Sequence, residues 1–123
     1  MAITEVLFDI TTDADGDSTD DHTHTVFGYL VKLVYAKTDF ADGVDLVLSM
    51  QSPPGAIAET IITLTNINAS AVHYPVVDPS DTAGAAETAQ PVRHLLVGTP
   101  RIVTDEGGAT KTGKVILYIE NAN

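Results

Sequence analysis

The sequence predicts an all-β protein, an antiparallel β-sandwich that forms a single domain over residues 1–123. Short β-patterned segments recur along the whole chain, and turn-forming residues separate them. No segment shows the 3.6-residue spacing of a long amphipathic helix. A chain of 123 residues is also too short to bury two separate hydrophobic cores. We expect a jelly roll first and an immunoglobulin-like sandwich second, because a strand pattern determines strand number better than strand order.

Each strand is predicted from the alternation of apolar and polar side chains. In the first, Val6, Phe8 and Ile10 fall on one face, whereas Glu5 and Asp9 fall on the other. The same alternation, or a run of β-branched residues, defines the later segments. The expected strands are residues 3–10, 22–27, 29–37, 44–50, 59–67, 71–77, 92–97, 101–105 and 113–120.

The strand at residues 29–37 also carries a predicted orientation. Tyr29, Val31, Leu33 and Tyr35 recur at every second position, and Lys32 lies between them. Successive side chains of a strand point to opposite faces. We therefore expect the four apolar residues to share one face.

Glycine, proline and acidic residues mark the connections between the strands. We expect Gly28 to separate two strands, and loops at residues 13–21, 39–43, 51–55 and 78–90. The last two strands flank a Gly-rich turn that contains Gly107 and Gly108. This arrangement predicts a C-terminal β-hairpin with a long, polar tip.

The charge of the chain excludes several classes of partner. Six Lys and Arg residues stand against 17 Asp and Glu residues, which gives a net charge of −11. Such a surface repels nucleic acid and anionic membranes, because binding them requires basic residues. No apolar run approaches the ~20 residues that span a bilayer, and residues 1–5 lack the basic and apolar regions of a signal peptide, so we expect none. Cysteine is absent, so disulfides and thiolate metal sites are excluded.

The acidic segment at residues 13–21 is a candidate calcium site. Asp13, Asp15, Asp17 and Asp21 provide carboxylates of the kind that bind Ca²⁺. However, His24 stands where an EF-hand loop would have its bidentate glutamate, and the flanking segments are strands. A solvated loop is therefore the first expectation, and we expect neither a metal nor another cofactor.

Three further motifs suggest chemistry but lack its context. His22 and His24 share a strand face, yet a metal site needs a third ligand. Residues 81–84 resemble an aspartic-protease motif, but Ala83 interrupts it. The Gly-rich turn at residues 107–112 leads into a strand, whereas a phosphate-binding loop leads into a helix. We therefore expect no catalytic residues and no enzyme activity.

Four motifs occur in order along the chain: D-F-A-D-G-V-D at residues 39–45, N-A-S-A-V-H-Y-P at 68–75, D-T-A-G-A-A at 81–86 and G-G-A-T-K-T-G at 107–113. Together they resemble a family of small all-β phage virion structural proteins, of the head decoration or capsid cement type. The resemblance covers most of the chain after residue 28. The acidic segment at residues 13–21 departs from the family pattern.

The resemblance implies a protein that is made in the host cytoplasm and binds the capsid exterior. Its partners would be the major capsid protein and further copies of itself, with a homotrimer favoured and a dimer possible. Lys111, Lys114, Arg101 and Arg93 are the candidate capsid contacts, since basic side chains suit an acidic capsid surface.

Two alternatives remain open. The first is a neck or tail component of the virion. The second is a carbohydrate-binding β-sandwich module, although such sites stack sugars on aromatic side chains and this chain has no Trp.

Overall fold

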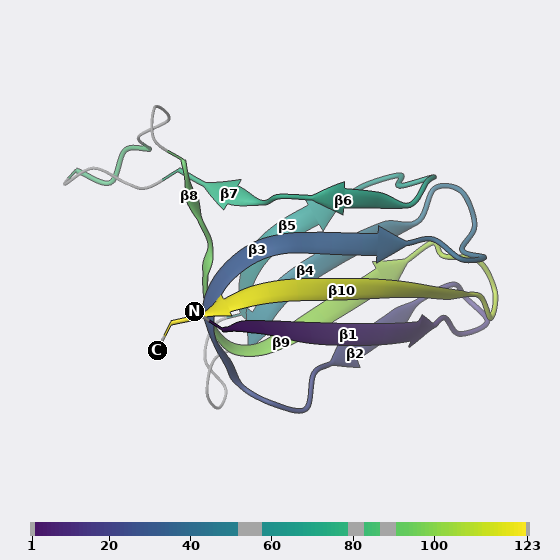
Figure 1. The fold of residues 1–123 in the computed structure, drawn as a ribbon. Coiled ribbons are helices and arrows are strands. Elements are labelled where there is room, and N and C mark those ends of the chain that lie inside the picture. The colour runs from purple at the N-terminus through teal and green to yellow at the C-terminus, as the bar shows by residue number, and fades with distance from the viewer. Residues whose placement is uncertain (1, 52–57, 79–82, 87–90, 123) are drawn as a thin grey trace.

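The protein is an antiparallel β-sandwich, as the sequence predicts. The computed structural model describes residues 2–51, 58–78, 83–86 and 91–122. Within these ranges the secondary structure is entirely β, and every strand pairs with its neighbours in the antiparallel sense (Figure 1).

The eight strands of the sandwich form one hydrogen-bonded sheet, joined by the pairing of β3 with β9, which folds over into two four-stranded layers; we call these layers the two sheets. The first sheet contains, in spatial order, β1 (Ile3–Thr11), β10 (Thr112–Asn121), β3 (Val26–Ala36) and β6 (Ala71–His73). The second contains β2 (Ser18–Asp21), β9 (Leu95–Asp105), β4 (Asp45–Gln51) and β5 (Ala58–Leu64). A separate ribbon consists of β7 (Val76–Val77) and β8 (Val92–Arg93).

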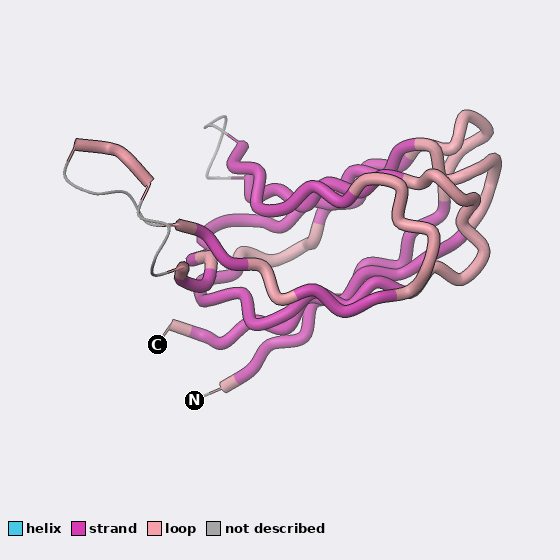
Figure 2. Tube along the Cα trace, turned by 90° about the horizontal axis from the view of Figure 1, so that it is seen from above, coloured by secondary structure: helices cyan, strands magenta, loops and turns pink. Residues whose placement is uncertain are grey.

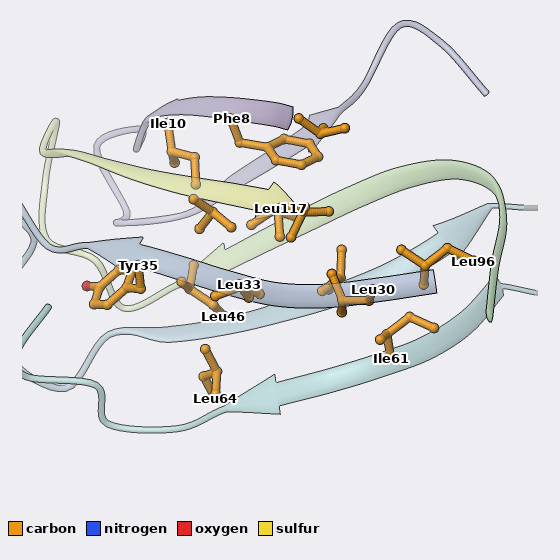
Figure 3. Close-up of a cluster of buried hydrophobic side chains, with 14 of the residues drawn as sticks. Phe8, Ile10, Leu30, Leu33, Tyr35, Leu46, Ile61, Leu64, Leu96 and Leu117 are labelled. Atoms are coloured by element: carbon orange, nitrogen blue, oxygen red, sulfur yellow. The ribbon is translucent and has the colours of Figure 1, made fainter. Parts of the chain in front are cut away.

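The hydrophobic core fills the space between the two sheets. Val6, Phe8 and Ile10 of β1 are all buried, which confirms the alternation predicted for this strand. Leu117 lies opposite Val6 on the neighbouring strand β10, and Leu46 belongs to β4 of the second sheet; both are part of the same buried cluster (Figure 3). Burial of such apolar surface is the main force that holds the sheets together.

Strand β3 is continuous through Gly28, so the predicted break at this glycine is wrong. A Cβ at this position would lie 2.3 Å from the backbone oxygen of Glu120. Glycine is needed here because two backbones approach closely, and it does not end the strand.

A β-bulge in β3 reverses part of the predicted orientation. Lys32 lies opposite Tyr118 and Leu30 lies opposite Ile119, which leaves Val31 without an opposite residue. The extra residue shifts the alternation by one. As a result Leu33 and Tyr35 are buried but Tyr29 is 39% exposed, so the prediction of one shared face is wrong.

Strand β9 crosses from one sheet to the other. Its first residues, Leu95 to Gly98, pair with β3, whereas the residues from Thr99 onward pair with β4. Gly98 has a φ of 124°, a conformation that favours glycine and lets the strand change direction. The predicted gap between residues 97 and 101 is therefore a bend within one strand.

The predicted C-terminal hairpin is wrong, because β9 and β10 do not pair with each other: β10 lies between β1 and β3, and β9 pairs with β3, β4 and β2. The connection between them is anchored instead of forming a free tip. The Gly107 amide donates to the Gly16 carbonyl at 2.9 Å, and the Gly107 carbonyl accepts from the Ala41 amide at 2.9 Å. The Thr12 hydroxyl donates to the Gly108 carbonyl at 2.6 Å. Three connections thus pack together at one end of the sandwich.

The predicted loop at residues 13–21 ends early, because Ser18–Asp21 form the edge strand β2 against β9. The predicted loops at residues 51–55 and 78–90 lie mostly outside the described residues, as do the first two residues of the protease-like motif at 81–84.

Candidate functional site

The first candidate calcium ligand, Asp13, is engaged by its own loop. Its Oδ1 accepts hydrogen bonds from the backbone amides of Asp15 at 2.9 Å and Asp17 at 3.0 Å. These amides, with that of Asp17 contributing most, hold the pKa of Asp13 below its ordinary value. The carboxylate therefore closes a turn.

The other acidic residues of this segment point to separate partners. Asp21 forms a bidentate pair with Arg101, at 2.6 and 3.1 Å, which lowers the pKa of Asp21. A hydrogen bond with the Asp105 carboxyl raises the pKa of Asp17, and burial adds to this effect. The four predicted carboxylates thus do not converge, and no three His, Asp or Glu side chains within the described ranges gather in a way that would hold a metal ion.

The two histidines form an aromatic contact. The rings of His22 and His24 lie edge to face with centroids 5.7 Å apart, and His22 also contacts the Phe8 ring at 6.3 Å. Partial burial, followed by the charge of His24, lowers the pKa of His22. The pair therefore packs over the edge of the core.

Two of the predicted capsid contacts are already paired within the chain. Arg93 Nη1 lies 2.7 Å from Glu120 Oε2, and Arg101 holds Asp21. Exposed ion pairs contribute about 0–1 kcal/mol each. Arg93 lies in β8 of the ribbon, whereas Arg101 lies in β9 of the sandwich, so the two arginines do not form one basic surface.

The two lysine candidates lie near the end of the sandwich that is opposite to Arg93. Lys114 Nζ is 3.5 Å from Asp9 Oδ1, and both side chains are more than half exposed. Lys111 is exposed in the β9–β10 connection, and within the described part of the chain it forms no ion pair. Of the four candidates, Lys111 is thus the one whose charge is available to a partner.

A shallow depression of about 270 Å³ lies beside the C-terminal end of β1. The ion pair of Asp9 and Lys114 and the hydroxyl of Thr112 line part of it. The depression presents no unpaired charge to a ligand, because the Lys114 ammonium and the Asp9 carboxylate neutralise each other.

An exposed apolar surface, which sequence reasoning missed, lies at the end of the sandwich where both chain termini lie (Figure 1). Phe27 lies opposite Val97 and Tyr29 lies opposite Leu95 across the β3–β9 pairing. These four side chains are between 39% and 57% exposed. We call them the terminal apolar surface.

The β7–β8 ribbon adds a second group of exposed apolar side chains. Tyr74, Val76, Val77 and Val92 are between 39% and 67% exposed. The ribbon pairs with neither sheet, and residues 83–86 lie well away from the sandwich (Figures 1 and 2). We call these four side chains the ribbon residues.

Arg93 connects the two groups. It lies opposite Val76 in the ribbon, and its guanidinium lies 5.5 Å from the centre of the Tyr29 ring. The same guanidinium pairs with Glu120, the residue opposite Tyr29 on β10. Glu120 is therefore neutralised at the junction, whereas the exposed Asp78, which follows Val77, forms no ion pair within the described residues.

A signal for this surface does exist in the sequence. Val26-Phe27 and Leu95-Leu96-Val97 place apolar residues at consecutive positions, so both faces of the strand are apolar. One face packs into the core, as Leu96 does, and the other must be exposed or covered by a partner.

A scan against protein-family models and searches of curated proteins and of solved structures found no match to this chain. The described residues also contain no helix that is long and apolar enough to cross a bilayer.

Proposed function

We propose that this protein is a phage virion structural protein, a head decoration (capsid cement) protein that binds the outside of the expanded capsid and stabilises it. The main support for the proposal is the uneven distribution of charged and apolar side chains over the surface. The chain has a net charge of −11, yet one end exposes several apolar side chains beside Glu120, whose charge Arg93 neutralises. Large exposed apolar patches mark interaction sites.

We also assign the sandwich to the jelly-roll class. Strands β1 to β4 alternate between the two sheets, and the spatial orders are β1-β10-β3-β6 and β2-β9-β4-β5. Two interleaved sheets of four strands support this assignment. The sequence motifs shared with small phage virion proteins support the same class of function.

A cement protein stabilises the capsid because its binding is thermodynamically linked to the state of the lattice. A protein that binds only the assembled, expanded lattice shifts the equilibrium toward that lattice. Many identical weak contacts around the shell then add through multivalency. Self-association, as a homotrimer at threefold positions or a dimer at twofold positions, would match the symmetry of the shell.

The contacts to the major capsid protein would be mainly apolar, with a small basic contribution. Arg93, Arg101 and Lys114 already pair with carboxylates of this chain. Lys111 remains the candidate for a salt-sensitive contact, since exposed charges are screened beyond about 8–10 Å near physiological ionic strength.

The test is reconstitution on capsids that lack the protein. Added protein is expected to bind expanded shells at a fixed stoichiometry set by capsid symmetry, and to leave compact procapsids unbound. Shells with bound protein should retain DNA to higher temperature than shells without it. Binding to a single vertex or along the tail would instead support a neck or tail component.

The exposed aromatics favour one other function, a carbohydrate-binding module. Phe27, Tyr29 and Tyr74 are exposed and could stack on sugar rings. Calorimetric titration with oligosaccharides distinguishes the two, because a glycan module would bind them in the absence of any capsid and would lose binding in Phe27→Ala.

A further inference from the structure

We propose that this chain docks onto a second copy of itself, with the ribbon residues of one copy lying on the terminal apolar surface of the other. This inference rests on the proposed function in one respect: it names the surface through which the decoration protein would self-associate. It does not require the capsid.

The ribbon needs a surface to lie on. Its two strands contain two residues each, and among the described residues two pairs, Val76 with Arg93 and Val77 with Val92, join them. An isolated two-stranded ribbon is marginally stable in water. The exposed valines would be stabilised by contact with a second apolar surface.

The available area suits a protein interface. The ribbon residues and the terminal apolar surface comprise eight side chains that are roughly half exposed. With typical areas for aromatic and aliphatic side chains they present roughly 500–800 Å². A standard interface buries about 800 Å² per partner, including its polar rim. Val76 and Val77 are consecutive in β7 and point to opposite faces, so the side chains on one face would supply a large part of such an interface and polar neighbours the rest.

The negative charge of the chain favours contact between two copies at the terminal apolar surface and the ribbon residues over contact at more acidic parts of the chain. Copies that each carry a charge of −11 repel one another, so they must meet where carboxylates are absent or neutralised. At the junction of the ribbon and the terminal apolar surface, Glu120 is neutralised by Arg93.

The open edge of β1 is the obvious competitor, because this nine-residue strand pairs with β10 on one side and with no described strand on the other. An antiparallel pairing of two such edges centred on Leu7 would place Glu5 opposite Asp9 of the second copy. Like charges in that position are unfavourable.

Each copy carries both halves of the contact, which favours a second copy over an unrelated partner. The ribbon residues and the terminal apolar surface adjoin at Arg93, so the two groups lie side by side on one copy and are both open to a second copy. Exchange between copies closes as a reciprocal pair or as a ring of three.

The experiment is sedimentation of the full chain at micromolar concentration, with a matched pair of variants on one strand. Val97→Glu changes the terminal apolar surface, and Val103→Glu changes an exposed valine of the same strand, 37% exposed on the second sheet. Val76→Glu changes the ribbon. Circular dichroism and thermal unfolding show whether each variant is folded.

We expect the wild-type chain and Val103→Glu to sediment as a dimer or trimer. Val97→Glu and Val76→Glu should raise the dissociation constant about 100-fold or more, because each buries an unpaired charge. A monomeric wild type, a folded Val97→Glu variant that stays associated, or equal loss in Val103→Glu would overturn the proposal.

Shell binding measured in parallel separates this inference from the proposed function. If wild-type monomers bind expanded shells and Val97→Glu abolishes that binding, the surface serves the capsid protein and self-docking is refuted. If the chain associates through Val97 and Val76 but never binds shells, the inference stands and the decoration function fails.

Discussion

The contact between Gly113 and Phe40 links the start of β10 to the connection between β3 and β4. Phe40 is buried, and its ring stacks on Tyr35 with centroids 6.4 Å apart. A Cβ at Gly113 would lie 2.1 Å from Cε2 and 2.5 Å from Cδ2 of Phe40. Gly113→Ala therefore forces either the ring or the strand to move.

The magnitude follows from this geometry. Inserting a methyl group into a packed site costs about 1–3 kcal/mol, and Phe40→Ala, which leaves a cavity, should cost about 3–5 kcal/mol. In the Phe40→Ala background the new Cβ meets empty space, so Gly113→Ala should cost about 1 kcal/mol or less. The two changes should thus be less than additive by about 1–3 kcal/mol.

Urea denaturation of the four proteins, followed by circular dichroism, measures this coupling. Each free energy of unfolding comes from the midpoint and slope of the transition. The reasoning is refuted if Gly113→Ala leaves stability unchanged, or if it costs the same with and without the Phe40 ring.

Three further predictions concern ionisable and buried polar groups. Asp105→Asn should raise the melting temperature at pH 7. The pKa of Asp17 is raised in the folded protein, so the contact of Asp17 with Asp105 stabilises the fold only at low pH, where Asp17 is protonated. The gain in melting temperature should therefore disappear near pH 3, and a gain that is independent of pH would contradict this. Tyr35→Phe should raise stability by about 1 kcal/mol, because the buried hydroxyl has no hydrogen-bond partner among the described residues; a loss on urea denaturation would indicate a hidden partner. Millimolar Ca²⁺ should leave the melting temperature unchanged, because Asp13 binds backbone amides; a rise of several degrees that Asp15→Ala removes would overturn this.

Local patterns in the sequence predicted much of the fold. The alternation of Val6, Phe8 and Ile10 predicted their burial, and repeated short strands predicted the sandwich. The errors arose where a distant strand decides the local geometry. The bulge at Val31 depends on the register with β10, and the close approach at Gly28 depends on the backbone of Glu120. Neither partner is visible from the local sequence.

The pairing of β9 and β10 failed for a related reason. A Gly-rich turn between two strands is compatible with a hairpin and equally with a connection between sheets. Long-range hydrogen bonds from Gly107 to Gly16 and Ala41 fix the second arrangement.

The candidate site was hardest to predict. Charged residues are the first candidates for binding a partner when only the sequence is known, but Arg93, Arg101 and Lys114 are paired within the chain. Phe27 and Val97 resemble core residues in a strand pattern, and only the orientation of β3 and β9 shows that they are exposed.

Electron microscopy of virions with and without this protein shows whether it decorates the capsid. The decoration function predicts additional density at symmetric positions over the whole outer shell, absent from particles that lack the protein. Density confined to one vertex or to the tail, or identical shells in the two samples, would contradict it.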